Sequence, residues 1–90
     1  MFILKFDEEI LQEAKKKILR KLFTKHIIGG KHTSFENIRK SFDRNEYPLA
    51  EEAIEGLVRE GFLMWHPTSY GKQYSINPRA IAVVKDLITQ

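Results

Sequence analysis

The 90-residue sequence has no cysteine, a single tryptophan, three prolines and five glycines. Without cysteine, neither a disulfide bond nor a thiolate metal site can form, which suits a reducing compartment. No run approaches the roughly 18 apolar residues that cross a bilayer. Residues 1–7 show no basic segment followed by an apolar one, so no signal peptide is expected. The default expectation is a cytoplasmic protein without a membrane partner.

The residues that are present are sufficient for one small folded domain. Hydrophobic residues make up 42% of the chain and aromatic residues 11%, so a disordered chain is not expected. Ninety residues leave no room for a second domain, and we predict a single domain over residues 1–90. The formal net charge of +3 permits a nucleic-acid partner without requiring one.

The spacing of apolar residues predicts four helices and one hairpin. Apolar side chains recur every three or four positions in four segments, which is typical of helices with one buried face. These segments are about residues 8–26, 34–42, 47–60 and 78–89. Before the last of them, two strand-like segments flank the turn residues Pro67 to Gly71, which predicts a β-hairpin with a several-residue loop over about residues 62–76. The alternation of residues 2–6 permits a further short strand.

Residues at the ends of the predicted helices fit the capping rules. Asp7 is placed as the N-cap of the first helix. Thr33 and Glu36 have the spacing of a capping box in front of the second. Pro48 suits the first turn of the third helix, and Gly61 suits its end.

The order of helix, helix, helix, hairpin, helix is that of a winged helix. Residues 49–63 (LAEEAIEGLVREGFL) and 71–78 (GKQYSINP) resemble the passage from the third helix to the wing in the winged-helix superfamily, particularly in small archaeal winged-helix proteins. The resemblance covers about residues 10–89. It implies an α+β fold, a winged helix-turn-helix in which a three-helix core is followed by a β-hairpin wing and a C-terminal helix. Winged helices serve both DNA binding and protein contact, so the fold alone does not identify the partner.

In the DNA-binding members, the third helix enters the major groove and the wing touches the DNA backbone or the minor groove. The resemblance therefore implies a double-stranded DNA-binding protein, a transcriptional regulator that binds without catalysing a reaction. The residues expected to contact DNA lie around the second helix, at the tip of the third helix and on or just beyond the wing: Lys31, Ser34, Arg39, Lys40, Arg44, Asn45, Tyr47, His66, Ser69, Tyr70, Lys72 and Arg79. Such proteins usually act as two-fold dimers. Residues 1–23 and the C-terminal helix are the segments left over for a homodimer contact.

The third predicted helix carries the wrong sign of charge for a helix that lies on DNA. Residues 48–60 contain four glutamates against Arg59 alone, a formal charge of −3. Apolar residues occupy its buried stripe, so the glutamates face outward, where phosphates repel them. The favoured interpretation is a solvated face with a Glu55–Arg59 pair. The alternative function is a protein-interaction subunit or adaptor of a larger nucleic-acid-processing complex, in which the acidic helix meets a basic partner.

The densest positive cluster lies in the first predicted helix. It comprises Lys15, Lys16, Lys17, Arg20, Lys21 and Lys25. Glu13 stands three and four positions before Lys16 and Lys17 and can pair with them, so a solvated helix face is favoured over a binding patch.

No residue set with recognisable catalytic or metal-binding spacing is present. His26, His32 and His66 have no helical i,i+4 spacing, and no cysteine or carboxylate completes a ligand set, so no metal or other cofactor is expected. The serines lack a nucleophile motif and no glycine-rich phosphate loop follows a strand, so an enzyme is not expected. Trp65 is expected to cover the core, whereas Tyr47 and Tyr70 are the expected binding aromatics.

Overall fold

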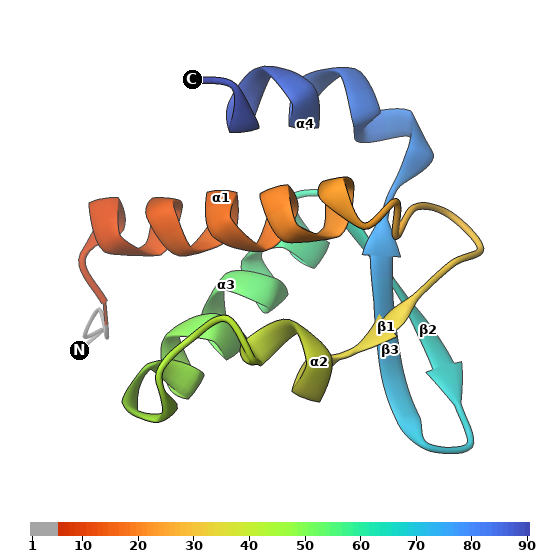
Figure 1. The fold of residues 1–90 in the computed structure, drawn as a ribbon, viewed down its shortest axis with the longest axis horizontal. Coiled ribbons are helices and arrows are strands. Elements are labelled where there is room, and N and C mark those ends of the chain that lie inside the picture. Colours follow the sequence, from red (N-terminus) through yellow and green to blue (C-terminus); the bar gives the residue numbers. More distant parts are fainter. Residues whose placement is uncertain (1–5) are drawn as a thin grey trace.

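The computed structural model describes residues 6–90, which form an α+β fold of four α-helices and a three-stranded antiparallel sheet (Figure 1). The elements in chain order are α1 (Glu8–Thr24), β1 (Thr33–Ser34), α2 (Phe35–Arg39), α3 (Tyr47–Arg59), β2 (Leu63–Thr68), β3 (Gly71–Ile76) and α4 (Ile81–Ile88). Short 3-10 turns, Arg44–Glu46 and Pro78–Ala80, lead into α3 and α4. The strand predicted over residues 2–6 falls outside the described range, apart from Phe6.

Helix α1 runs through the middle of the molecule, with α4 on one side and α2 and α3 on the other (Figure 1). The sheet packs at the C-terminal end of α1, and its hairpin extends beyond the helices. Every helix and the central strand contribute to the core, through Ile18, Leu22, Ile38, Leu57, Ile76 and Val84, each at most 1% exposed. Burying one such side chain contributes about 1.5–3 kcal/mol. None of the helices formed by residues 6–90 is long and apolar enough to span a membrane.

Helix α1 begins as predicted and ends two residues early. The Asp7 carboxylate accepts a hydrogen bond from the Glu9 backbone N–H at 2.8 Å, which confirms the N-cap. The helix ends at Thr24 because His26 adopts a left-handed backbone conformation, with φ of 57°. The Ile27 N–H then donates to the Leu22 carbonyl at 2.9 Å, a bond that closes the helix terminus.

Helix α2 is shorter than the predicted 34–42 and has a different cap. The N-cap is Ser34, whose Oγ accepts from the Asn37 N–H at 3.2 Å. Thr33, the predicted cap, lies in a strand instead. At the other end the Phe42 N–H donates to the Arg39 carbonyl at 2.8 Å, so the chain turns out of the helix and buries the Phe42 ring.

Strand β1 was not predicted from the sequence. It pairs antiparallel with β3, Thr33 opposite Tyr74 and Ser34 opposite Gln73. The sheet order is β1-β3-β2, which makes β3 the central strand. Two residues are too few to show the alternation that reveals a strand in a sequence.

The predicted hairpin is present, with a tighter turn than expected. Strand β2 continues through Pro67 to Thr68, which pairs with Gly71, so only Ser69 and Tyr70 form the turn. Pro67 is tolerated because β2 is an edge strand, where no ladder hydrogen bond is lost. The Thr68 hydroxyl braces the turn by donating to the Gly71 carbonyl at 2.6 Å and accepting from the Tyr70 N–H at 3.1 Å.

Helices α3 and α4 follow their predicted boundaries closely. Pro48 occupies the first turn of α3. Gly61 ends that helix with φ of 87°, a conformation that favours glycine, and the Phe62 N–H returns to the Leu57 carbonyl at 2.9 Å. Asn77 caps the next turn by accepting from the Arg79 N–H at 3.0 Å. That turn is 3-10, so α4 itself starts at residue 81 instead of 78.

Candidate nucleic-acid interface

Exposed polar side chains gather where α2 ends and α3 begins. Lys40 follows the last residue of α2, and Arg44 and Asn45 lie in the 3-10 turn directly before α3. All three are exposed. The structure therefore places two cations and one amide, all predicted DNA contacts, near the N-terminal end of α3.

Arg39 belongs to the same region but is held against aromatic rings. Its guanidinium carbon lies 4.4 Å from the centre of the Tyr47 ring and 5.6 Å from that of Phe35. Stacking of this kind contributes about 0.5–1 kcal/mol at exposed sites. Tyr47, expected as an exposed binding aromatic, is half-buried beneath this cation.

The turn of the hairpin presents a second group of predicted contacts. Tyr70 is 93% exposed, and Ser69 beside it is exposed as well. The Lys72 ammonium lies 4.8 Å from the centre of the Trp65 ring. The prediction that Trp65 covers the core is wrong, since this side chain is 47% exposed. The reason is that Leu63, two residues earlier on the same face, already completes the core, and the hairpin then continues past the helices.

Between these two groups lies a cleft lined by carboxylates. The cleft has a volume of about 260 Å³ and is bounded by α2, α3 and the hairpin. Its acidic residues are Glu36 from α2 and Glu51 and Glu55 from α3. Burial raises the pKa of the Tyr74 phenol at the cleft wall, and the charges of Glu55, Glu51 and Glu36 raise this pKa further. The wall of the cleft formed by α2 and α3 is therefore negative, and Lys72 lines the cleft from the hairpin.

We expect a spectroscopic titration of the three tyrosines to show one that ionises above the ordinary tyrosine range. Tyr74→Phe should remove that transition, and Glu51→Gln with Glu55→Gln should lower its pKa. Because the folded-state pKa of Tyr74 exceeds the unfolded value, this residue stabilises the fold below the unfolded pKa, about 10, and that stabilisation is lost as pH rises through the folded pKa. A tyrosine titration unchanged by the glutamine pair would contradict the acidic cleft.

Four of the predicted contact residues lie elsewhere or are already bonded. Lys31 and Arg79 flank the base of the hairpin near Ile76. Strand β3 rises about 3.4 Å per residue, so Ile76 lies roughly 17 Å from Gly71 at the turn. Ser34 Oγ serves as the α2 cap. His66 Nε2 lies 3.0 Å from Ser75 Oγ. The structure does not bring these four residues together with the turn of the hairpin.

Two of the histidines form a stacked pair on the sheet. The ring centres of His32 and His66 are 4.7 Å apart. His32 Nδ1 lies 2.6 Å from Gln73 Oε1. Both rings thus take part in hydrogen bonding.

The basic run of α1 divides between core and surface. Lys15 is 7% exposed, and its ammonium bonds both Glu60 carboxylate oxygens at 3.0 and 3.1 Å. A Cβ at Gly56 would lie 2.9 Å from Lys15 Cε, so this glycine leaves room for the lysine stem. Within residues 6–90 this is the only ion pair shorter than 4 Å, so neither the expected Glu55–Arg59 pair nor the expected pairs within α1 are formed.

Another lysine of α1 supports the end of α2. The Lys21 ammonium donates to the Asn37 carbonyl at 2.6 Å and lies 3.4 Å from that of Ile38. Burial lowers the pKa of Lys21, and the nearby charges of Lys25 and Lys40 lower it further. The sequence pattern predicts neither this role nor that of Lys15, because both depend on which helices pack against α1.

No protein-family model, curated protein or solved structure matches this chain. The architecture therefore defines the structural class of the protein. Residues 6–90 form an α+β domain with four α-helices and a projecting antiparallel hairpin. Sequence reasoning anticipated the negative charge of α3 but missed that Glu36 joins it. The i,i+4 spacing places Glu51 and Glu55 on one face of α3, whereas the approach of α2 to that face depends on tertiary packing.

Proposed function

We propose that this chain is a winged-helix domain that binds double-stranded DNA through the tip of α3 and the hairpin. The observation that carries the proposal is the exposure of Lys40, Arg44 and Asn45 at the entry to α3, on a domain whose hairpin presents Tyr70 and Lys72. The order of elements also supports it, because two helices joined by a turn precede a two-stranded antiparallel wing.

In this mode of binding, the tip of α3 enters the major groove and the wing follows the backbone. Arg44 and Lys40 neutralise phosphates, Asn45 reaches a base edge, and Lys72 contacts the backbone from the wing. The carboxylates of Glu51 and Glu55 repel phosphates, so the middle of α3 stays out of contact. Affinity then comes from few cations, so binding is modest and falls only moderately with salt. A regulator of transcription is the role that fits such a domain best.

Fluorescence anisotropy with a mixed-sequence duplex at low salt tests this proposal. The wild-type chain should bind, and Lys40→Ala with Arg44→Ala should weaken binding at low salt. Each neutralised phosphate contact contributes about 0.9 to the slope of log affinity against log salt, so the double variant should lose about two from that slope. Both side chains are exposed, so the fold should not change.

The matched control is Lys25→Ala with Lys85→Ala, which removes two exposed cations from the end of α1 and from α4. This variant should keep most of the affinity and nearly the wild-type salt slope. Absence of wild-type binding at low salt would overturn the proposal. Equal losses of DNA affinity in the two variants would show general electrostatic attraction to DNA without a defined binding site.

A second candidate function is contact with a basic segment of another protein. The specific observation in its favour is the acidic cleft, in which Glu36, Glu51 and Glu55 surround Tyr74 beside the exposed Tyr70. Complementary charge would select a basic peptide over DNA at this position. The domain would then serve as an adaptor in a nucleic-acid-processing complex.

A further inference from the structure

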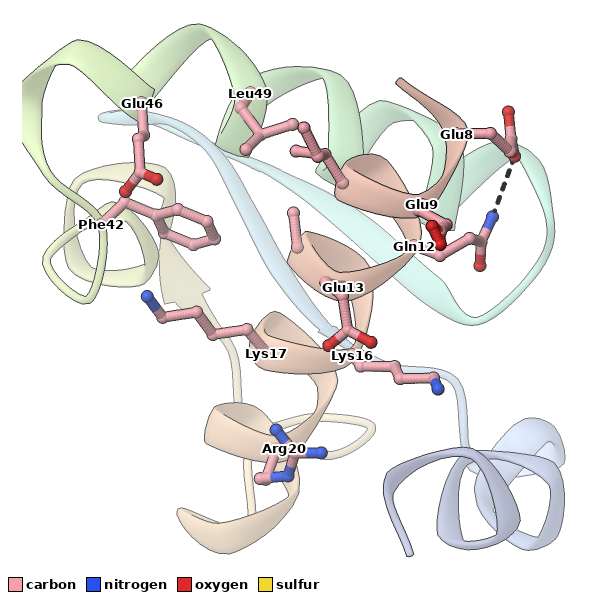
Figure 2. Close-up of a pocket in the computed structure, with 12 residues that line it drawn as sticks. Glu8, Glu9, Gln12, Glu13, Lys16, Lys17, Arg20, Phe42, Glu46 and Leu49 are labelled. Carbon is pink, nitrogen blue, oxygen red and sulfur yellow. Dashed lines mark hydrogen bonds between the residues drawn. The ribbon is translucent and has the colours of Figure 1, made fainter. Parts of the chain in front are cut away.

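The outward face of α1 is divided into an acidic half and a basic half. Glu9 and Glu13 occupy its N-terminal half, and Lys16 and Arg20 follow in the C-terminal half. Steps of four, three and four residues place these side chains in one stripe along the helix. Figure 2 shows these side chains along α1, with Phe42, Glu46 and Leu49 on one side of the helix and α4 on the other. The side chains of the stripe border a hollow that Phe42, Glu46 and Leu49 also line.

The hollow also offers apolar surface. Its volume is about 850 Å³, and it is lined by the charged stripe, by the further charged residues Glu8, Lys17 and Glu46, and by Ile10, Phe42 and Leu49. Ile10 is 53% exposed and supplies most of the exposed hydrophobic side chain in this hollow, because Phe42 and Leu49 are each 8% exposed. Phe42 and Leu49 border the hollow from the opposite side (Figure 2).

Within residues 6–90, the charges of this stripe have no ion-pair partner closer than 4 Å. The one ion pair under 4 Å in residues 6–90 joins Lys15 to Glu60 and includes no member of the stripe. Arg20 reaches α4 only through a long hydrogen bond, 3.5 Å, to the Ile88 carbonyl. Glu9, Glu13 and Lys16 therefore remain available to a partner.

We propose that this face binds a second copy of the chain, with the two α1 helices antiparallel about a two-fold axis. An axis midway between Glu13 and Lys16 sets Glu13 opposite Lys16 of the second copy and Glu9 opposite Arg20 of the second copy. The two-fold axis generates a second copy of each charge pair. The same surface is therefore complementary to itself, as a two-fold dimer requires. The exposed Ile10 side chain supplies apolar area that the charges alone lack.

Of the two segments that the sequence leaves for a homodimer contact, residues 1–23 and the C-terminal helix, the structure favours the first. Helix α4 uses its apolar face against α1, with Val84 fully buried, so it is not the principal contact. Helix α1 retains a charged stripe and an exposed isoleucine. The inference does not depend on whether the domain binds DNA or protein.

Complementary charge-reversal variants test the pairing. Lys16→Glu with Arg20→Glu makes the stripe wholly acidic, and Glu9→Lys with Glu13→Lys makes it wholly basic. We expect the wild-type chain to sediment at twice its 10.6 kDa mass, and each variant alone to dimerise at least about a hundred-fold more weakly, because like charges then face each other. An equimolar mixture of the two variants should form the heterodimer.

Exchanging the two charges within one chain tests whether misfolding explains the weaker dimerisation of the reversal variants. Glu13→Lys combined with Lys16→Glu keeps the net charge and preserves opposite charges across the axis, so this variant should still dimerise. A monomeric wild-type chain at high concentration would overturn the proposal and leave the hollow to a different protein. So would a mixture of the two reversal variants that stays monomeric, or reversal variants that dimerise as well as wild type.

Discussion

Glu51→Gln with Glu55→Gln should strengthen binding to duplex DNA roughly ten-fold at low salt. A charge about 6 Å from a phosphate opposes binding by on the order of 0.7 kcal/mol in water, so two such charges together oppose it by about 1.4 kcal/mol, which corresponds to a ten-fold change in affinity. Both glutamates are exposed and make no ion pair shorter than 4 Å with any residue from 6 to 90, so their neutralisation should leave the fold intact. Anisotropy titration on the duplex used for the wild-type chain measures the change.

Glu8→Gln with Asp86→Asn is the control for net charge. It adds the same two units of charge on α1 and α4, away from the cleft between α3 and the hairpin. A gain confined to the cleft variant indicates that DNA lies beside α3. Equal gains would indicate general attraction alone. If the cleft is instead a protein site, the cleft variant should lose its basic partner and gain no more DNA affinity than the control.

Leu22→Ala should lower the free energy of unfolding by about 2–5 kcal/mol. Leu22 is 0% exposed in the middle of the core, and truncation removes its buried methyl groups and leaves a cavity that the surrounding helices cannot fill. Domains are stable by only about 5–15 kcal/mol, so this one change would remove a large share of the total. Urea unfolding followed by circular dichroism gives the value.

Val83→Ala in α4 provides the comparison for that measurement. Val83 is 51% exposed, and its truncation should change the free energy of unfolding by about 0.5 kcal/mol or less. A Leu22→Ala variant as stable as Val83→Ala would contradict the position of α1 at the centre of the packing.

Predictions based on local chemistry were the accurate ones. The Asp7 cap, Pro48 in a first helical turn, the left-handed Gly61 and the hairpin all depend on residues within a few positions of one another. Capping and turn formation need no distant partner, so they can be derived from the sequence. The prediction of the α2 cap failed because Thr33 and Ser34 suit a cap equally in the sequence and both pair with β3; the helix begins at Phe35, so Ser34 is the residue that caps it.

The assignments that failed required knowledge of what packs against each side chain. Trp65 is exposed because Leu63 already completes the core on its strand, whereas Lys15 is buried because Gly56 leaves space and Glu60 supplies the opposite charge. Alternation along a strand and spacing along a helix indicate the direction in which a side chain points. They do not indicate where the helix or strand packed against that side chain ends.

The sequence by itself determined the four helices, the hairpin and the negative charge of α3, because periodicity and charge are local properties. Only the tertiary structure decided that β1 joins the sheet, that Glu36 completes an acidic cleft around Tyr74, and that Glu9, Glu13 and Lys16 of α1 have no ion-pair partner under 4 Å among residues 6–90. Each of these depends on side chains brought together from distant parts of the chain, and such proximity is a product of packing.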